Sequence, residues 1–300
     1  MEFLSYLISG ISLGSVYAII ALGYTMVYGI AKMLNFAHGD VIMVGGYISL
    51  MAMNALTAAM PGSPWLANLL SVVVAMIVCT VLGVVIEGLA YKPLRAAPSL
   101  AVLITAIGVS YFLQNTALLV WGANPKTYST VVSGTLKLFN GQLSISVISL
   151  VTMAACIIIM LGLTAFTGNT KMGKAMRACS EDKDAARLMG INVNTTISVT
   201  FAIGSALAAV AGVLLCSFNP TLMPTTGSMP GIRAFTAAVF GGIGSIPGAF
   251  LGGILLGVIE SLAKAYISTQ LSNSIVFAVL IVVLLVRPAG LLGKYVPEKV

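Results

Sequence analysis

The chain has 300 residues, of which 59% are hydrophobic and only 8% are charged, with a formal net charge of +7. A soluble domain carries roughly 25% charged residues, so this chain has too few charges to cover a water-facing surface. Its continuous apolar runs also exclude a membrane β-barrel, whose strands alternate in polarity over roughly ten residues. The basic residues stand in short loops beside apolar runs, as expected on the cytoplasmic side of a membrane, and indicate no nucleic-acid partner.

The apolar runs predict an all-α protein with about eight membrane-crossing helices. A helix needs about 20 apolar residues to cross the hydrocarbon core of a bilayer. The predicted segments lie near residues 4–30, 40–59, 66–90, 99–121, 143–167, 194–217, 232–260 and 267–286. Residues 122–142 predict a polar loop, and residues 218–231 a second irregular stretch. We expect residues 1–300 to form a single transmembrane domain, with no soluble domain fused to it.

A cluster of polar residues separates the first two apolar segments. It reads Asn35-Phe-Ala-His38-Gly39-Asp40 and contains the only histidine of the chain. Breaks between membrane helices often carry the polar groups of a substrate path, which makes Asn35 and His38 candidate translocation-path residues. The alternative is a short surface loop in which Asn35 caps a helix and Asp40 lies in its first turn.

Much of the charge is gathered in one short window. Five of the 15 basic residues and three of the eight acidic residues lie there: Lys171, Lys174, Arg177, Glu181, Asp182, Lys183, Asp184 and Arg187. The excess of lysine and arginine places residues 168–192 in the cytoplasm. The turn with Lys92 and Arg95, two crossings earlier, is then also cytoplasmic, and the loops 122–142 and 218–231 face outward.

The same window predicts a short amphipathic helix. Ser180 would cap it, with Glu181 and Asp182 in its first turn, and Gly190 would end it. Its apolar face would consist of Ala185, Ala186, Leu188 and Met189. Such an element is either a docking surface for a partner or a solvated connector. Cys179 lies in this window, and we expect it to be unbonded and open to thiol reagents from the cytoplasm.

Residues 168–175 nearly match a phosphate-binding loop, but an alanine, Ala175, stands where the motif needs a hydroxyl group to hold Mg²⁺. The preceding residues predict a membrane helix, whereas the motif follows a strand. The chain also has a single histidine and four cysteines without a CxxC pair, which excludes a zinc site and indicates no disulfides. We therefore expect no nucleotide site, metal site, cofactor or enzymatic activity in this chain.

The segment 232–260 is expected to be broken. Three apolar segments follow the charged window, yet two cytoplasmic ends require an even number of crossings, since Arg287, Lys294 and Lys299 place the C-terminal tail inside. Residues 240–248 are rich in glycine and form a poor helix interior. We predict a broken or re-entrant element that is split near Ser245-Ile246-Pro247, with Gly241, Gly242 and Ser245 as further translocation-path candidates.

The number of crossings also predicts the side of the membrane on which the N-terminus lies. Five crossings before the charged window place the N-terminus outside, unless a further break near Asn35–Gly39 changes the number.

Several glycines have GxxxG spacing, namely Gly10/Gly14, Gly244/Gly248, Gly248/Gly252 and Gly253/Gly257. This spacing lets membrane helices approach closely. The alternative is that these glycines line a translocation path.

Several stretches together carry a resemblance over essentially the whole chain. They are Gly23-Tyr-Thr-Met-Val-Tyr-Gly29, Asn35-Phe-Ala-His-Gly39, Arg177-Ala-Cys-Ser-Glu-Asp182, Leu188-Met-Gly-Ile-Asn192, Phe235–Ala249 and Arg287-Pro-Ala-Gly-Leu291. The chain resembles the permease subunits of bacterial ABC importers for branched-chain amino acids, specifically the H-type permease of the leucine/isoleucine/valine system. The resemblance implies a multi-pass protein of the bacterial inner membrane.

The resemblance also implies partners. They are a second homologous permease subunit, two cytoplasmic ABC ATPase subunits, a periplasmic amino-acid-binding protein and the lipid bilayer. A cytoplasmic coupling helix, which seats in a groove of the ATPase in this family, maps onto about Arg177–Asn192. The implied ATPase-coupling residues are Arg177, Glu181, Asp182, Arg187, Leu188, Met189 and Gly190.

Two other classes of protein are the alternatives to an ABC permease. A secondary transporter or channel would work without an ATPase and would usually carry charged residues within its spans, whereas Glu87 and Glu260 lie at the ends of predicted segments. Glu260 has a partner of its own in Lys264, at i,i+4 spacing. A membrane enzyme would need a nucleophile with a base or a metal set, and neither is present.

Overall fold

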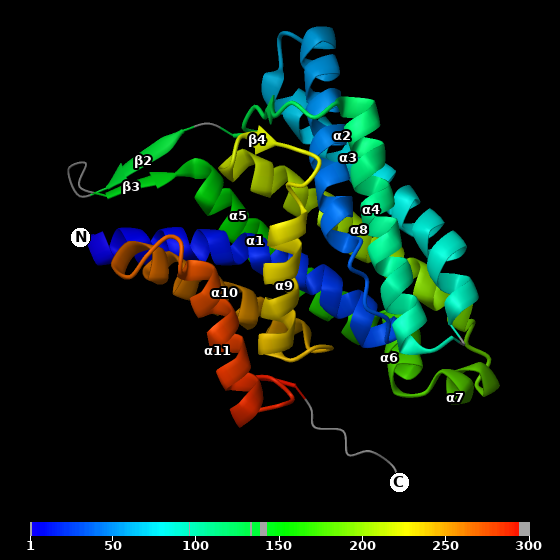
Figure 1. Cartoon of the computed structure of the whole chain (residues 1–300). Helices are drawn as coiled ribbons and strands as arrows, with labels where there is room; N and C mark the ends of the chain where they lie inside the picture. The colour runs from blue at the N-terminus through cyan, green and yellow to red at the C-terminus, as the bar shows by residue number, and fades with distance from the viewer. Residues whose placement is uncertain (1, 96, 133, 139–142, 294–300) are drawn as a thin grey trace.

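The computed structural model describes residues 2–95, 97–132, 134–138 and 143–293, and this part of the chain is a helical bundle with two small sheets at one end (Figure 1). The helices are α1 (Glu2–Ala31), α2 (His38–Ala59), α3 (Pro64–Ile86), α4 (Ser99–Trp121), α5 (Val147–Asn169), α6 (Lys171–Glu181), α7 (Lys183–Leu188), α8 (Val193–Phe218), α9 (Ser228–Gly241), α10 (Ile246–Tyr266) and α11 (Ser272–Val286).

Seven helices in the described part are long and apolar enough to cross a membrane. They are α1, α2, α4, α5, α8 and α10, together with α3, which continues through a π-helical turn (Glu87–Tyr91) and a 3₁₀ turn (Lys92–Leu94). The apolar α11 has 15 residues and α9 has 14, so both are shorter. This agrees with the prediction of about eight spans in an all-α membrane protein.

The predicted break in the glycine-rich segment is confirmed. Helix α9 ends at Gly241 and α10 begins at Ile246, and between them Gly242 and Gly244 have φ of 105° and 95°, a left-handed conformation that favours glycine. The Ser245 hydroxyl caps α10 by accepting a hydrogen bond from the Gly248 backbone N–H. In the described part of the chain, four helices, α8 to α11, therefore follow the charged window, and of these α8 and α10 are long enough to cross a membrane.

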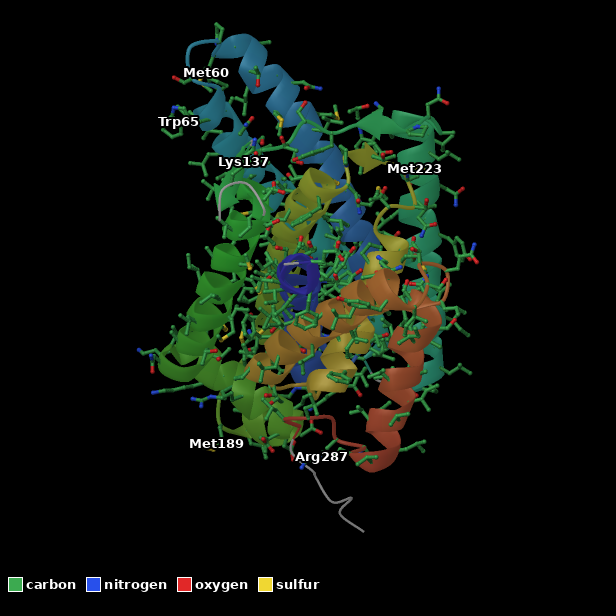
Figure 2. The ribbon with its side chains drawn as sticks, turned by 90° about the vertical axis from the view of Figure 1, so that its left-hand side faces the viewer. Met60, Trp65, Lys137, Met189, Met223 and Arg287 are labelled. Carbon is green, nitrogen blue, oxygen red and sulfur yellow. The ribbon has the colours of Figure 1, made fainter. Side chains whose placement is uncertain are left out.

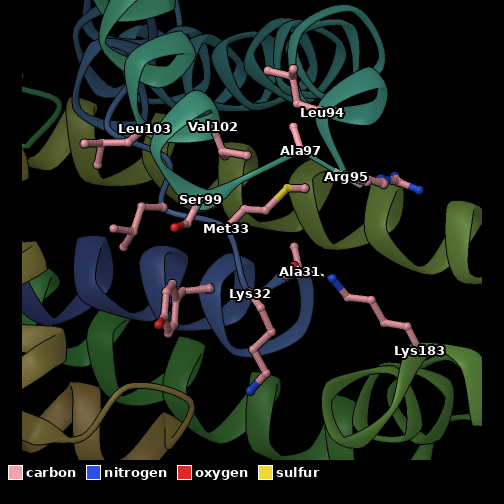
Figure 3. Close-up of a pocket in the computed structure, with 12 residues that line it drawn as sticks. Ala31, Lys32, Met33, Leu94, Arg95, Ala97, Ser99, Val102, Leu103 and Lys183 are labelled. Carbon is pink, nitrogen blue, oxygen red and sulfur yellow. Dashed lines mark hydrogen bonds between the residues drawn. The ribbon is translucent and has the colours of Figure 1, made fainter.

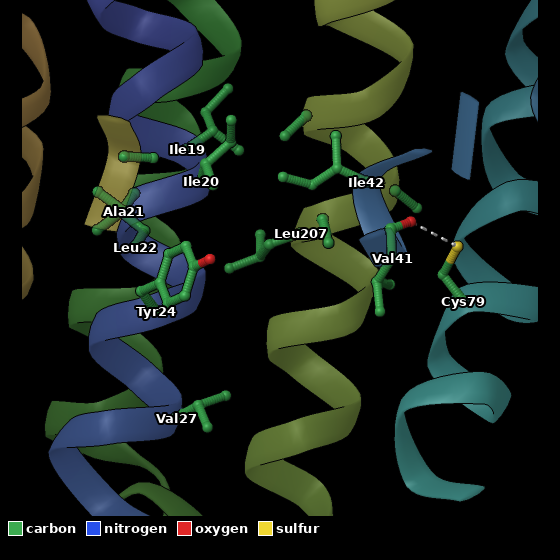
Figure 4. Close-up of a cluster of buried hydrophobic side chains, with 14 of the residues drawn as sticks. Ile19, Ile20, Ala21, Leu22, Tyr24, Val27, Val41, Ile42, Cys79 and Leu207 are labelled. Atoms are coloured by element: carbon green, nitrogen blue, oxygen red, sulfur yellow. Dashed lines mark hydrogen bonds between the residues drawn. The ribbon is translucent and has the colours of Figure 1, made fainter. Parts of the chain in front are cut away.

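Helix α1 forms the centre of the core. Each residue from Val16 to Leu22 is at most 1% exposed. Figure 2 looks along α1 and shows the other helices around it. In Figure 4 its apolar side chains face Leu207 of α8, and beyond α8 the Cys79 thiol of α3 donates to the Val41 carbonyl of α2 at 3.7 Å.

The close packing predicted from the glycine spacing is confirmed between α1 and α10. A Cβ atom on Gly257 would lie 2.2 Å from the Gly14 Cα atom, and one on Gly253 would lie 2.4 Å from the Ala18 Cα atom. Real Cβ atoms do not approach backbone this closely. Glycine at these positions therefore lets the two helix backbones touch.

The outer helices expose apolar rather than polar side chains. The most hydrophobic windows of α3 and α4 are each only 22% buried, compared with 72% for α8. The exposed side chains include Leu69, Ile77 and Val81 on α3 and Leu100, Ile104 and Phe112 on α4. These faces suit contact with lipid or with another membrane protein.

The end of the molecule at the predicted outer loops carries two short antiparallel pairs of strands. Strand β1 (Lys126–Thr127) pairs with β4 (Thr221–Leu222), and β2 (Thr135–Leu138) pairs with β3 (Leu143–Ser146). The prediction that residues 143–146 begin a helix is wrong. Leu143-Ser-Ile-Ser146 alternates apolar and polar residues, a period of two that favours a strand, and α5 begins only at Val147.

Candidate functional site

The N-terminal ends of two helices, α2 and α9, meet within the membrane-spanning part of the fold. The first residues of α2 lie against the segment that leads into α9: a Cβ atom on Gly227 would lie 1.8 Å from the Gly39 carbonyl oxygen. The Gln114 amide nitrogen donates to Asp40 Oδ1 at 2.9 Å and to the Ser228 hydroxyl at 3.2 Å. Gln114 lies seven residues before Trp121, the end of α4, so this junction is inside the span and not at a loop.

Both path candidates from the first polar cluster are buried beside this junction. His38 is 1% exposed, and its ring lies against that of Tyr24, with ring centroids 4.6 Å apart. Asn35 accepts a hydrogen bond from the Tyr91 hydroxyl at 2.8 Å. The alternative of a surface loop with Asn35 as helix cap is wrong, because Ala37 occupies the N-cap position of α2 and Asn35 is buried. Asp40 does lie in the first turn of α2, as that alternative expected, but it is buried.

Gln114 and Ser228 also belong to this junction, and the sequence did not identify them as candidate path residues. Both side chains are partly exposed, although they lie at membrane depth, and Gln114 also reaches the Ser110 hydroxyl at 3.3 Å. A signal was present, because Gln114 interrupts the apolar segment 99–121. Polar side chains within a membrane span usually face a partner or a water-filled path rather than lipid.

The other three path candidates lie at a different place, the turn between α9 and α10. There a Cβ atom on Gly242 would lie 2.3 Å from the Gly293 nitrogen, and one on Gly29 would lie 3.1 Å from the Gly244 Cα atom. The Leu292 N–H also donates to the Gly241 carbonyl at 2.9 Å. The structure therefore brings Gly241, Gly242 and Ser245 together near the end of α1, whereas His38 packs on Gly23 and Tyr24, earlier in α1.

The charged window forms two helices, so the prediction of one helix capped by Ser180 is wrong. The Thr170 hydroxyl caps α6, and α6 continues through Ser180 to Glu181. The Asp182 carboxylate then caps α7 by accepting from the N–H groups of Asp184 and Ala185 at 2.8 and 3.0 Å. A carboxylate satisfies the free N–H groups of a first turn and favours its positive end, which explains why the second helix begins here.

The predicted end of this element is confirmed. Gly190 has φ of 81°, its N–H donates to the Arg187 carbonyl, and the Ile191 N–H donates to the Ala186 carbonyl, both at 3.0 Å. These two bonds form a Schellman motif. Of the predicted apolar face only Ala186 is buried, while Leu188 is 90% and Met189 is 82% exposed.

The coupling candidates lie together on one exposed end of the molecule. In Figure 2, Met189 and Arg287 lie at the end opposite Met60 and Trp65. The Arg187 guanidinium pairs with Asp184 at 2.9 Å, and both side chains are exposed. Arg177 donates to the Gly168 carbonyl at 3.2 Å, and Glu181 is exposed.

Cys179 is free, as expected, but it is 1% exposed, so the expectation that thiol reagents reach it is wrong. It lies on the face of α6 that packs against the bundle. We predict that, in inside-out vesicles from cells that express the chain without its partners, an impermeant maleimide labels a Leu188→Cys variant rapidly and leaves native Cys179 unlabelled. Slow labelling of Leu188→Cys there, with rapid labelling in intact spheroplasts, would reverse the orientation assigned to α7.

Glu260 is not at the end of a span, as the sequence suggested, but inside α10 and fully buried. Its Oε1 atom accepts from Lys264 at 2.6 Å, the predicted partner, and from Arg233 of α9 at 2.9 Å. Its Oε2 atom accepts from the Tyr17 hydroxyl at 2.9 Å. Two cations thus surround this carboxylate, and the cluster connects α1, α9 and α10. Glu87 likewise lies inside its span, in the π-helical turn seven residues before Leu94, where it is buried and pairs with Arg95.

A bundle of apolar helices with a polar junction inside its spans and an exposed helical element at one end defines a membrane permease. Residues 6–285 match the family model for the permease component of branched-chain amino acid transport systems, and the chain belongs to this family. It is the permease subunit of a transporter and a multi-pass protein of the inner membrane, as predicted.

The curated relatives agree with this assignment. The chain is 46% identical to the high-affinity branched-chain amino acid transport system permease proteins LivH of Salmonella typhimurium and Escherichia coli, with 100% of this chain and 98% of each relative covered. It is 44% identical, with the same coverage, to the corresponding protein BraD of Pseudomonas aeruginosa. No solved structure matches the chain.

Proposed function

We propose that residues 1–300 form the transmembrane subunit of an importer that moves branched-chain amino acids inward, using ATP that partner subunits hydrolyse. The names of the relatives supply the substrate class. One observation carries the proposed coupling to ATP: Leu188 and Met189 are 90% and 82% exposed at the tip of α7. Two adjacent large apolar side chains on a water-facing end suit a hydrophobic groove on a partner.

The other coupling candidates have supporting roles in this proposal. Asp182 and Gly190 begin and end α7 and so hold Leu188 and Met189 at its tip. Arg177, Glu181 and Arg187 surround this tip with charges that would orient a partner. Helix α6 packs on α1, α5 and α8, so a displacement of α7 would reach the core of the bundle through α6.

The partners follow from this mechanism: two cytoplasmic ABC ATPases below, a second permease beside this chain, and a periplasmic amino-acid-binding protein above. The residues of the near phosphate-binding loop lie at the junction of α5 and α6, directly after a membrane helix. ATP would therefore bind only to the ATPases. Purification of the tagged chain in mild detergent should recover both ATPases and a second permease, whereas recovery of an active carrier without an ATPase would refute the proposal.

The substrate route is proposed to pass the junction of α2, α4 and α9. Both α2 and α9 begin there, so two positive helix ends point to one region, as in transporters with interrupted helices. Asn35, His38 and Asp40 lie on the α2 side of the route, and Gln114 and Ser228 open it toward the second permease. The turn at Gly241, Gly242 and Ser245 would form its cytoplasmic exit.

Asp40 is expected to matter most for transport along this route. In an Asp40→Asn variant the amide oxygen can still accept from Gln114, but the negative charge is lost. Hydrogen bonds to charged groups contribute about 1.5–3 kcal/mol and those between neutral groups about 0.5–1.5 kcal/mol, so we expect uptake of leucine to fall roughly 5- to 10-fold. Unchanged recovery of the complex serves as control, and parental uptake by that complex would exclude Asp40 from the route.

A further inference from the structure

A cavity of about 240 Å³ lies beside the coupling element, between the end of α1, the start of α4 and α7 (Figure 3). One part of its wall is basic and consists of Lys32, Arg95 and Lys183. The other part is largely apolar and includes Met33, Leu34, Leu94, Val102 and Leu103. No residue described as lining this cavity is acidic. The cavity thus joins an anion-attracting side to a hydrophobic side.

Among the described residues, only one of the three basic side chains forms an ion pair with a carboxylate. Arg95 pairs with Glu87, which is 1% exposed and also accepts from the Ser198 hydroxyl at 2.7 Å. The Lys183 ammonium points to the end of α1, where it donates to the Ala31 carbonyl at 2.7 Å (Figure 3). Lys32 is exposed, at a left-handed turn with φ of 57°. Among the described residues, Lys32 and Lys183 thus form no ion pair, and the ammonium of Lys183 is held by a carbonyl at the end of α1.

Other positive charges lie close to Lys183. The pKa of its ammonium is lowered, first because the group is partly buried and then because Arg95 and Lys32 lie nearby. Positive charges that repel one another at a partly buried site favour the binding of an anion. An anion with a single compact charge centre, such as a phosphate group, would relieve this repulsion.

We propose that this cavity binds the phosphate of an anionic phospholipid, with Lys32 and Lys183 as its ligands. A lipid fits better than a soluble anion because the apolar wall continues onto α4, where Leu100 and Ile104 are 64% and 61% exposed. An acyl chain can follow these side chains while the headgroup stays at the basic wall. Basic pockets between membrane helices bind lipid headgroups in this way. With the proposed orientation of the chain, this lipid would lie in the cytoplasmic leaflet of the membrane.

The test titrates the purified full-length chain in neutral detergent with phosphatidylglycerol and follows the midpoint of thermal unfolding. Phosphatidylcholine and inorganic phosphate are titrated in parallel. Lys32→Gln and Lys183→Gln are each expected to raise the half-maximal phosphatidylglycerol concentration about fivefold, and the double variant about 25-fold. Lys174→Gln, an exposed lysine of α6 away from the cavity, is the matched control and should bind as the parent does.

Two results would overturn the proposal. If the double variant responds to phosphatidylglycerol as the parent does, the lipid binds elsewhere. If inorganic phosphate gives the same stabilisation, the ligand is a free anion. Should the double variant fail to fold, Lys32→Gln decides alone, because this exposed side chain supports no packing, and Lys183→Arg, which keeps the charge, should retain parental binding.

Discussion

Replacing Leu188 and Met189 together with serine is expected to abolish transport and stimulated ATP hydrolysis in parallel. Both side chains are almost fully exposed in the isolated chain, so their substitution leaves the fold intact. Burial of a Leu or Met side chain in a partner groove contributes about 1.5–3 kcal/mol, or about 3–6 kcal/mol for the pair. At about 1.4 kcal/mol per tenfold, docking would weaken by a factor of about 100 or more.

The measurement is leucine uptake by cells together with ATPase activity of the reconstituted complex, with and without loaded binding protein. Leu271→Ser is the control, since Leu271 is an exposed leucine outside α6 and α7. Charge reversal at Asp182 would be a poorer test, because this carboxylate caps α7 and its loss would disorder the helix as well as the docking surface. A double variant that keeps its ATPases and transports at the parental rate would show that α7 is only a connector.

Replacing Glu260 with leucine is expected to destabilise the chain strongly. Glu260 is fully buried, whereas the side chains of Arg233 and Lys264 are 17% and 37% exposed. Removing one partner of a buried ion pair typically costs about 3–5 kcal/mol, because the other charge remains without compensation. Arg233 also donates to the Tyr17 hydroxyl at 2.8 Å and to Asn273 at 2.5 Å, so the loss would loosen α9 against α1 and α11.

Thermal unfolding of the purified chain in detergent measures this loss of stability. The double variant Glu260→Leu/Arg233→Leu distinguishes the effect of an uncompensated buried charge from the effect of lost packing and hydrogen bonds. With both buried charges removed, an apolar pair can fill the space, and stability should recover most of what the single variant loses. A double variant less stable than either single variant would show that packing or the Tyr17 and Asn273 hydrogen bonds dominate, rather than the buried charge.

Features that depend on local physics could be predicted from the pattern of residues alone. The membrane spans followed from runs of apolar residues, because transfer into lipid depends on each segment's own composition. The break between α9 and α10 followed from the glycine-rich stretch at 240–248, and Gly190 was placed correctly because a left-handed helix end favours glycine. The family followed from stretches that extend over nearly the whole chain.

Which polar groups come into contact could not be predicted before the helices were placed in the fold. Asp40, Gln114 and Ser228 come from three separate helices, α2, α4 and α9, and Glu260 pairs with Arg233 across the break between α9 and α10. Sequence reasoning also chose the wrong cap: Ser180 and Asp182 both suit the start of a helix locally. Asp182 forms the cap because α6, held by the packing of Met176 and Cys179 against the bundle, continues past Ser180. Contacts between distant segments, which no local pattern encodes, made each of these choices.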